Sequence, residues 1–276
     1  MKFFAPAKVN LSLRVLRKRD DGFHEIETLM APVAIFDTLA IERRTGGGLE
    51  FICSDPALPA DADNLVVRAA RSFCGSLGLE PHLRIELKKR IPHGAGLGGG
   101  SSDAATTLLA LDAIFETRLA QMDIMHIAAE IGSDVPFFLA RSAAWCRGRG
   151  EIVEPCVLRR ALPLLLIKSP FGVPTPWAYK QWRNSIEIPG APYGPQTLGG
   201  ITLVNDLERP VFEKFIQLAE MKRWLLEQPE TASALMSGSG STIFAVLRGK
   251  SAGPAFSEKA RTQFGPHAWL ALTETV

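Results

Sequence analysis

The chain has 276 residues, of which 46% are hydrophobic and 22% charged, and 31 Lys and Arg stand against 29 Asp and Glu. This composition is typical of a folded globular protein and excludes the disordered, fibrous and low-complexity classes. The net charge is only +2 and basic residues are interleaved with acidic ones, so no nucleic-acid partner is expected.

Apolar runs along the chain are short. The longest, residues 161–167, contains Pro163 and falls well below the ~20 residues that span a bilayer. Near the start, Lys8 and Arg14 interrupt the apolar residues too soon for a signal peptide. We therefore expect a cytoplasmic protein with no membrane contact. The 4 cysteines are widely spaced and form no C-x-x-C, which favours buried reduced thiols over disulfides or a zinc site.

The first predicted element is a strand at residues 8–15, where polar and apolar side chains alternate strictly. This pattern predicts a half-buried strand whose polar face carries Lys8 and Asn10 side by side. A second alternating segment, residues 83–87, leads through Pro92 into a cluster of glycines.

A helix is predicted directly after the glycines, because apolar residues recur at helical spacing from Ala104 to Phe115. Residues 122–131 form a further helical segment, which Gly132 ends. The order of this region is therefore strand, glycine-rich loop, helix, helix.

Past about residue 155 the succession of strands and helices restarts. Helices on one side of a mixed or antiparallel sheet, twice over, define an α+β protein of two lobes. We expect the boundary between residues 151 and 163, which divides the chain into lobes 1–155 and 156–276. The elements expected in the second lobe are a strand at 164–168, a helix at 177–183, a mobile or irregular loop at 189–200, a helix at 211–227, strands at 232–236 and 242–247, a helix at 255–264 and a strand at 268–272.

The glycine-rich segment, residues 92–103, places five glycines and two serines directly before a helix. Glycines let the backbone approach a ligand closely, and the free N–H groups of a helix start attract an anion. The segment therefore predicts a phosphate-binding loop. The alternative is an ordinary loop in which Ser102 or Asp103 caps the helix, but a cap needs one such residue and no glycine cluster.

Other nucleotide-binding motifs do not fit this chain. The only Gly-Lys-Ser, residues 249–251, has Phe244 where the first glycine of a Walker A motif belongs. Gly94, Gly96 and Gly99 satisfy a bare G-x-G-x-x-G, yet a helix follows where a dinucleotide-binding fold needs a second parallel strand. Protein kinases need V-A-I-K and H-R-D segments, and neither occurs.

Three blocks, in this order along the chain, resemble the signature motifs of the GHMP small-molecule kinases, the group of galactokinase, homoserine kinase and mevalonate kinase. They are Pro6-Ala7-Lys8-Val9-Asn10-Leu11, Pro92-x3-Gly96-Leu97-Gly98-x2-Ser101-Ser102 and Ser237-Gly238-Ser239-Gly240-Ser241-Thr242. The resemblance implies a two-lobed α+β fold, with an N-terminal lobe like the second domain of ribosomal protein S5 and a ferredoxin-like C-terminal lobe.

Within that group, further blocks resemble the branch that uses ATP to phosphorylate the 2-hydroxyl of a cytidylated methylerythritol, a step of the non-mevalonate isoprenoid precursor pathway. These blocks are Asp21-Gly22-Phe23-His24, Gly132-Ser133-Asp134-Val135-Pro136-Phe137-Phe138 and Asn205-Asp206-Leu207-Glu208. The resemblance implies two small-molecule partners and a monomer or weak homodimer. The alternatives are a GHMP kinase of the homoserine or mevalonate type and a catalytically silent nucleotide-binding module.

The resemblance implies a catalytic pair formed by Lys8 and Asp134. Asp134 would be the base beside the acceptor hydroxyl, and Lys8 would keep it ionised and stabilise charge as the phosphoryl group passes. Considered without the family, Asp134 is an N-cap for the short turn at 135–137, in which Pro136 occupies a first-turn position. Lys8 alone is an ordinary polar-face strand residue.

The resemblance also places ATP over the glycine-rich loop, with the phosphates on the glycine backbone. Mg²⁺ is inferred from the chemistry of phosphoryl transfer and is expected near Ser101 or Ser102. The sequence holds no carboxylate cluster that indicates a metal cage, so no metal ligand is assigned. The residues expected to bind ATP are Pro92, His93, Gly94, Ala95, Gly96, Leu97, Gly98, Gly99, Gly100, Ser101 and Ser102.

For the acceptor, the resemblance implies that Phe23 and Tyr179 sandwich the cytosine and that His24 hydrogen-bonds its polar edge. Many family members have tyrosine where this chain has Phe23, so the ring face is kept and a hydroxyl contact is lost. Trp177 is a rival for the second stacking position, and core packing is the alternative for each aromatic ring. The erythritol or diphosphate portion would contact Asn10 and Thr175.

The last glycine-rich block, residues 237–242, has two interpretations. It is either a simple turn that joins two strands or, as the third motif of the family, a segment whose backbone packs against the phosphate-binding loop and the acceptor.

Overall fold

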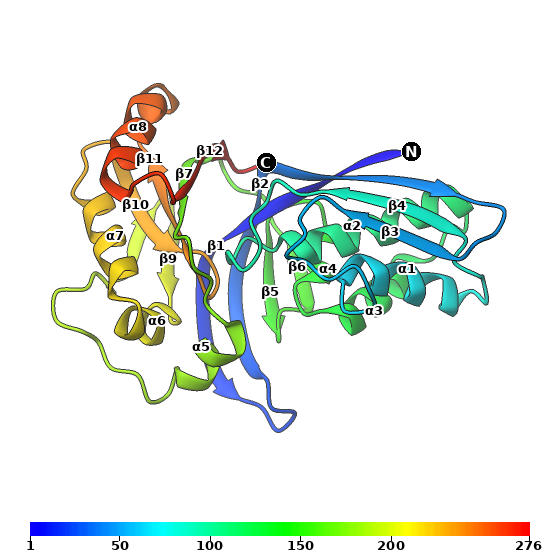
Figure 1. Cartoon of the computed structure of the whole chain (residues 1–276). Coiled ribbons are helices and arrows are strands. Elements are labelled where there is room, and N and C mark those ends of the chain that lie inside the picture. The colour runs from blue at the N-terminus through cyan, green and yellow to red at the C-terminus, as the bar shows by residue number, and fades with distance from the viewer.

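The computed structural model describes all 276 residues, which form two sheets and their covering helices. Figure 1 shows two lobes, with α1 to α4 on one side of the first sheet and α6 to α8 on the outer side of the second. No helix combines the length and the apolar character needed to cross a membrane.

The larger sheet has eight strands in the order β3-β4-β2-β1-β9-β8, and β5 pairs with β2 and with β6. Its strands are β1 (Lys2–Lys18), β2 (His24–Arg43), β3 (Leu49–Cys53), β4 (Leu83–Lys88), β5 (Ala144–Gly148), β6 (Ile152–Pro155), β8 (Gln196–Leu198) and β9 (Ile201–Asn205).

The long hairpin of β1 and β2 is the centre of this sheet, with paired residues from Lys2–Ala40 to Lys18–His24. The strand predicted at residues 8–15 lies within β1, but most of its polar face is not exposed: Lys8, Asn10 and Ser12 are nearly as buried as the apolar residues that alternate with them, and of the predicted polar face only Arg14 is exposed. The side chains of Lys8 and Asn10 point into the cavity described below, so they are shielded from bulk solvent. The sequence did not predict β2, because apolar residues run on through its middle without alternation.

Two strands of the second half of the chain join the first sheet. β9 lies parallel to β1 through the pairs Ser12–Val204 and Leu13–Asn205, and β8 pairs with β9. The expectation of an irregular loop at 189–200 is therefore wrong for its last part, because a short strand forms there by hydrogen bonding to β9. The division into lobes 1–155 and 156–276 stays a prediction.

Four helices pack on the first sheet around a core of 26 buried residues. The predicted helices after the glycine-rich loop are confirmed, and α1 is an element that the sequence analysis did not predict. Its N-terminus is capped by the Asn64 side chain, which accepts a hydrogen bond from the Val66 amide. These helices are α1 (Leu65–Ser76), α2 (Gly99–Phe115), α3 (Gln121–Ile131) and α4 (Val135–Leu139).

The second sheet has four strands in the order β10-β11-β7-β12, all antiparallel. Its strands are β7 (Pro163–Lys168), β10 (Thr231–Met236), β11 (Thr242–Leu247) and β12 (Trp269–Glu274), close to the predicted ranges. The helices of this half are α5 (Thr175–Gln181), α6 (Glu208–Lys214), α7 (Ile216–Leu226) and α8 (Gly253–Phe264), preceded by the short 3₁₀ turn η1 (Lys250–Ala252).

The single helix predicted at 211–227 is in fact two helices, α6 and α7. They are separated at Phe215, whose backbone leaves the helical region with φ −118 and ψ 70. The ring of Phe215 stacks on Phe171 with a centroid separation of 5.1 Å and meets Trp177 edge-on. Burial of this aromatic ring therefore accompanies the break in the helix.

Candidate active site

The three signature motifs, residues 6–11, 92–102 and 237–242, are far apart in the sequence but contact one another in the structure. The Lys8 amide donates to the Leu97 carbonyl over 2.9 Å, which joins β1 to the glycine-rich loop. The Ser237 hydroxyl donates to the Gly96 carbonyl over 2.9 Å, and the Thr242 amide donates to the Ala95 carbonyl over 3.2 Å. The prediction that residues 237–242 pack against the glycine-rich loop is therefore confirmed.

Close packing explains why glycine is needed in this loop. Gly96 has φ +74, and a Cβ atom at this position would lie 2.1 Å from the Ser237 carbonyl oxygen. Gly98 has φ +69, and its Cβ would lie 2.9 Å from Cγ of Lys8. Both positions exclude a side chain on grounds of backbone conformation and of space.

The start of α2 is left free for a ligand. Gly98 is its N-cap residue and has no side chain to bond the first amides. Ser102 and Asp103 lie inside the helix, so the alternative in which either of them caps it is wrong. Unpaired amides at the N-terminus of a helix of 17 residues attract an anion.

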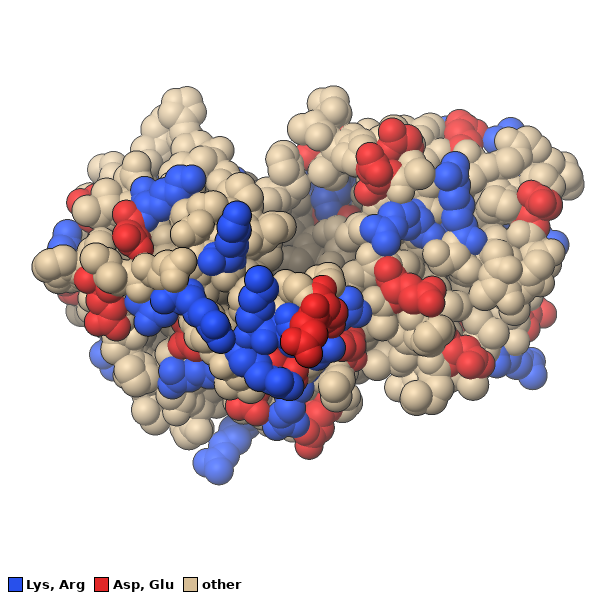
Figure 2. Space-filling model, turned by 90° about the horizontal axis from the view of Figure 1, so that it is seen from below, with Lys and Arg blue, Asp and Glu red and all other residues tan.

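A cavity of about 1180 Å³ opens between the lobes and is lined by 41 residues. Figure 2 shows this hollow, with basic side chains gathered beside it. Nearly all residues expected to bind ATP or the acceptor contribute to its wall. They are Asn10, Phe23, His24, Pro92, His93, Gly94, Ala95, Gly96, Leu97, Gly98, Gly99, Gly100, Ser101, Thr175 and Tyr179.

Lys8 and Asp134 lie together in this cavity. Nζ of Lys8 is 3.5 Å from Oδ2 of Asp134, and the two side chains are 4% and 36% exposed. The Lys8 ammonium also donates to Oδ1 of Asn10 over 2.6 Å, and Nδ2 of Asn10 donates to the Thr28 hydroxyl over 2.8 Å. Asn10 and Thr28 therefore hold a nearly buried cation beside a carboxylate that solvent can reach.

Asp134 occupies the N-cap position of α4, yet its side chain makes no capping hydrogen bond. The interpretation of this residue as a structural cap is therefore not supported. The turn between β5 and β6 lies directly beside it, because a Cβ on Gly150 would be 3.5 Å from Oδ1 of Asp134. The carboxylate is thus left with Lys8 as its charged partner.

The other end of the cavity is aromatic. The rings of His24 and Tyr179 stack with a centroid separation of 5.4 Å, and Trp182 meets His24 edge-on. Phe23 is 48% exposed, and the Arg149 guanidinium lies 4.8 Å from the centre of its ring. These rings give a flat ligand both exposed and buried aromatic faces.

Charges around this end affect the neighbouring titratable groups. Burial lowers the pKa of His24, and the nearby cations Lys18 and Arg183 lower it further, so the imidazole is held neutral. Burial raises the pKa of the Tyr179 phenol, which stays protonated and able to donate a hydrogen bond.

Trp177, the rival of Tyr179 for the second stacking position, does not line the cavity. Its ring packs edge-on against Phe215, and the Lys214 ammonium lies 4.4 Å from its centre. Thr175, by contrast, lines the cavity, and its hydroxyl lies 2.7 Å from the hydroxyl of Ser239. The geometry therefore favours Tyr179 over Trp177 as a ring that a ligand can reach.

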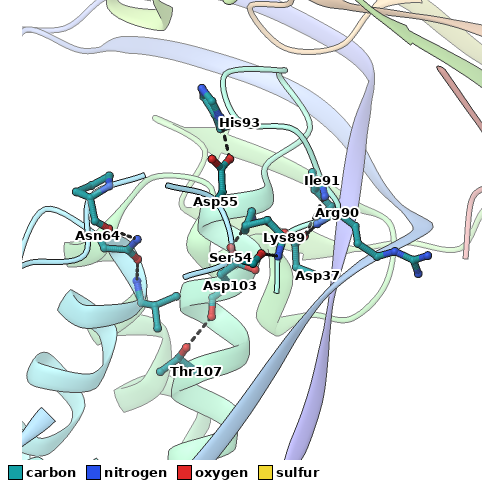
Figure 3. Close-up of polar contacts among 12 residues, drawn as sticks. Asp37, Ser54, Asp55, Asn64, Lys89, Arg90, Ile91, His93, Asp103 and Thr107 are labelled. Atoms are coloured by element: carbon teal, nitrogen blue, oxygen red, sulfur yellow. Dashed lines mark hydrogen bonds and ion pairs between the residues drawn. The ribbon is translucent and has the colours of Figure 1, made fainter. Parts of the chain in front are cut away.

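A buried charge cluster beside the glycine-rich loop was missed by the sequence analysis. Figure 3 shows Lys89 between Asp37 and Asp103, and its ammonium bonds both carboxylates, with 2.6 Å to Asp103. Asp37 also accepts hydrogen bonds from the amides of Arg90 and Ile91, which lead into the loop. Burial raises the pKa of Asp103 to about 7. The partners lie 52 and 14 residues apart in sequence, so no local pattern identifies them.

The structure offers little to a metal ion by itself. No group of three His, Cys, Asp or Glu is arranged as a metal cage. Asp103 is already bonded to Lys89, whereas the Asp134 carboxylate and the Ser101 hydroxyl lie on the cavity wall among several other side-chain oxygens, which include those of Asp21 and Asp63. This donor set fits a Mg²⁺ ion whose ligands come mainly from nucleotide phosphates.

Comparison with known proteins agrees with this site. Residues 64–142 match the family model for the GHMP kinases N terminal domain. The 4-diphosphocytidyl-2-C-methyl-D-erythritol kinase of Methylacidiphilum infernorum is 41% identical over 284 residues, 98% of this chain and 95% of that protein. The enzyme of the same name from Protochlamydia amoebophila is 39% identical over 91% of this chain and 85% of its own length.

Solved structures show the same fold. A crystal structure of 4-(cytidine 5'-diphospho)-2C-methyl-D-erythritol kinase superposes with a TM-score of 0.81 at 36% identity and covers 100% of both chains. Homoserine kinase from Cytophaga hutchinsonii has a TM-score of 0.66 at 20% identity, with 100% of this chain and 94% of that chain covered, and it shares the fold. The predicted two-lobed α+β fold is thereby confirmed.

Fold and site together define a small-molecule kinase of the GHMP class, with a glycine-rich loop, a lysine and a carboxylate in one cavity. Within that class, the chain belongs to the family of 4-diphosphocytidyl-2-C-methyl-D-erythritol kinases.

Proposed function

We propose that the chain transfers the terminal phosphoryl group of ATP to the 2-hydroxyl of 4-diphosphocytidyl-2-C-methyl-D-erythritol, in the non-mevalonate route to isoprenoid precursors. The observation that carries this proposal is that the Lys8–Asp134 pair lines the same cavity as the glycine-rich loop and the aromatic residues Phe23, His24 and Tyr179. The relatives of 34–41% identity carry the name of this activity.

ATP binds, in this proposal, with its phosphates over residues 92–102. The free amides at the start of α2 and the backbone around Gly96 and Gly98 supply hydrogen-bond donors to the phosphate oxygens. Mg²⁺ would be held mainly by those phosphates, with the Ser101 hydroxyl or the Asp134 carboxylate as a protein donor, and it would supply charge neutralisation for the phosphoryl group.

Asp134 accepts the proton of the acceptor hydroxyl as its oxygen forms the new bond to the terminal phosphorus of ATP. The bond from that phosphorus to the bridging oxygen of ADP breaks, and ADP leaves with the electron pair. Lys8 lies 3.5 Å from the Asp134 carboxylate, so its ammonium stabilises the negative charge that spreads over the phosphoryl oxygens in the transition state. Asn10 keeps the ammonium in place through the 2.6 Å bond to Oδ1.

The cytosine ring stacks on Phe23 and Tyr179, and His24 bonds its polar edge. His24 is neutral, so one ring nitrogen donates and the other accepts, as a cytosine edge requires. Asn10 and Thr175 lie on the wall of the same cavity and would contact the erythritol or the diphosphate.

The aromatic end distinguishes this proposal from a kinase of the homoserine or mevalonate type, because a small aliphatic acceptor has no use for stacking rings. The Lys8–Asp134 pair argues against a catalytically silent nucleotide-binding module. A cytoplasmic location and a monomer or weak homodimer remain predictions from the sequence.

The proposal is tested by ADP release from purified protein with Mg²⁺ATP and each of three acceptors: 4-diphosphocytidyl-2-C-methyl-D-erythritol, homoserine and mevalonate. We expect turnover with the cytidylated acceptor alone. The Asp134→Asn protein, purified in the same way, measures any contaminating ATPase. Turnover with homoserine or mevalonate instead would overturn the assignment of the acceptor, and ATP binding without turnover on any acceptor would overturn the assignment as a kinase of these substrates.

A further inference from the structure

Asn205 ends strand β9, at the point where β9 pairs with Leu13 of β1. It opens the block Asn205-Asp206-Leu207-Glu208, to which the site described above assigns no role. Asn205 is 4% exposed and does not line the cavity, so it does not reach a ligand. Its contacts nevertheless lead directly to the catalytic pair.

The carboxamide of Asn205 uses all of its strong hydrogen-bonding groups. Nδ2 donates to the Met236 carbonyl over 2.7 Å and to the Gly238 carbonyl over 2.8 Å. Oδ1 accepts from the Leu207 amide over 2.9 Å. One buried side chain therefore holds both sides of Ser237, the first residue of the third motif.

The backbone that Asn205 holds touches the catalytic residues. A Cβ on Gly238 would lie 3.3 Å from Oδ1 of Asn10 and 3.5 Å from Nζ of Lys8, so the turn lies directly beside both side chains. The Ser237 hydroxyl accepts from the Asn10 amide over 3.3 Å and donates to the Gly96 carbonyl. A shift of this turn would displace Lys8 and the phosphate-binding loop together.

The residues after Asn205 complete the attachment. The Asp206 carboxylate accepts from the Val15 amide over 2.9 Å, which fixes the block to β1, the strand that carries Lys8. Glu208 accepts from the Met236 amide over 2.9 Å and forms a buried ion pair with Lys222. Met236 is thus held at its N–H by Glu208 and at its C=O by Asn205.

We infer that Asn205 is a positioning residue for phosphoryl transfer: its two N–H bonds fix the turn at Ser237–Gly238, and this turn sets where Lys8 and Asn10 stand relative to the phosphate-binding loop. This inference rests on the proposed kinase function. Loss of the two bonds lowers kcat, because a displacement of the order of 1 Å at a reacting centre costs about 100-fold in rate. Phe23 and Tyr179, the rings expected to stack on the cytosine, lie outside this turn, so KM for the acceptor changes less than kcat.

The chain offers a matched control in Gln196. Its carboxamide also bonds the backbone of β10, with Nε2 donating to the Ala234 carbonyl over 2.7 Å and Oε1 accepting from the Ala234 amide over 3.0 Å. Gln196 does not line the cavity, and its partner lies two residues before Met236 on the same strand. Both Asn205→Ala and Gln196→Ala thus remove side-chain hydrogen bonds to the backbone of β10. Asn205→Ala does so next to the Ser237–Gly238 turn, and Gln196→Ala does so farther from it.

The experiment measures kcat and both KM values for the wild-type protein, Asn205→Ala, Asn205→Asp and Gln196→Ala, with thermal unfolding of each. We expect kcat to fall about 10- to 100-fold in both Asn205 variants and to stay at the wild-type value in Gln196→Ala. Asn205→Asp keeps the shape and the bond to Leu207, and it turns an oxygen toward two carbonyls.

Equal kcat in Asn205→Ala and Gln196→Ala would overturn the inference, as would a loss confined to the melting temperature. If both Asn205 variants fail to fold, Asn205→Ser, which keeps one donor, takes their place, and wild-type kcat in it would contradict the inference. Failure of the proposed function is read separately, as an absence of turnover in the wild-type protein.

Discussion

Lys8 and Asp134 face each other across 3.5 Å, with the ammonium nearly buried and the carboxylate open to the cavity. The asymmetry separates two tasks. The Lys8 ammonium is held by Asn10 and is too buried for a substrate to displace it. The Asp134 carboxylate is open to the cavity and makes no hydrogen bond to the start of α4, so it is free to contact a substrate. This arrangement suits in-line phosphoryl transfer, which depends on positioning and on neutralising charge.

Replacing Asp134 by Asn removes the carboxylate proposed as proton acceptor and keeps the shape of the side chain. We expect kcat to fall about 10²- to 10⁴-fold, the usual contribution of a positioned general base, with the affinity for ATP retained. Turnover and nucleotide binding are measured in parallel. Asp112→Asn, near the far end of α2 where Asp112 bonds the Thr117 hydroxyl, serves as the control. Wild-type kcat in Asp134→Asn would show that the carboxylate only orients the acceptor or does not take part.

Replacing Phe23 by Ala removes the exposed stacking face. Stacking of a base on an aromatic ring contributes about 1–3 kcal/mol, so KM for the cytidylated acceptor should rise about 5- to 150-fold while KM for ATP stays constant. Phe4→Ala is the control, since Phe4 is also an exposed phenylalanine and lies outside the cavity against Phe36. An unchanged KM for the acceptor would contradict the proposal that the cytosine ring stacks on Phe23.

Replacing Gly96 by Ala places a Cβ atom 2.1 Å from the Ser237 carbonyl oxygen. The loop and the third motif must then separate, so we expect ATP binding to be lost or weakened at least 10-fold, the effect of a displacement at the reacting centre. Gly78→Ala is the control, because Gly78 also has a left-handed backbone, with φ +64, and no atom within 4 Å of a Cβ.

The two alanine variants share the backbone strain of about 1–2 kcal/mol for a non-glycine residue in this region. Only Gly96→Ala adds the collision. Isothermal titration with a non-hydrolysable ATP analogue, together with thermal unfolding, separates the two effects. Equal nucleotide affinity in both variants would show that the contact between loop and turn is not needed for binding.

The buried Asp103 predicts a pH dependence of stability. Burial raises its pKa from 3.8 to about 7, so the folded protein keeps a proton that the unfolded chain has released. Between those values the unfolded state binds fewer protons, and the contribution of Asp103 to the free energy of unfolding therefore falls as the pH rises, reaching its least favourable value above about 7.

Asp103→Asn removes this titration and still leaves Lys89 bonded to Asp37. Denaturant unfolding at pH 5 and pH 8 should show that the variant gains stability relative to the wild type at the higher pH, by about 1–3 kcal/mol, the cost of an imperfectly paired buried polar group. The difference between the two proteins cancels the titration of groups that do not interact with Asp103. A constant difference at both pH values would contradict the prediction.

Local patterns made part of this structure predictable. Five glycines before an apolar helix predict a glycine-rich loop that leads into α2, because glycine content and helix periodicity act within a few residues. The roles of Lys8 and Asp134 came only from resemblance to a family, since each residue alone has an ordinary structural explanation. Their proximity depends on the packing of α4 and the glycine-rich loop against β1, which no local pattern reveals.

Long-range features were the ones missed. The sequence of β2 does not alternate between polar and apolar residues, because both faces of the strand are covered in its middle. Since this strand was not predicted, nothing in the sequence indicated that Asp37, which lies on it, bonds Lys89. The break at Phe215 depends on the ring of Phe171, 44 positions earlier by residue number and on another segment. These features follow from contacts that exist only once the chain has folded.

The pairing of β9 with β1 has a consequence for synthesis on the ribosome. The bond between the Val15 amide and Asp206 joins residues 191 positions apart, and at 5–20 residues per second the second partner appears roughly 10 to 40 s after the first. During that time the edge of β1 that will receive β9 is unpaired, and an open strand edge is prone to pair with other chains. The nascent enzyme therefore carries Lys8 on a strand with one open edge until about three quarters of its 276 residues have been translated, and this is the interval in which a ribosome-bound chaperone would protect it.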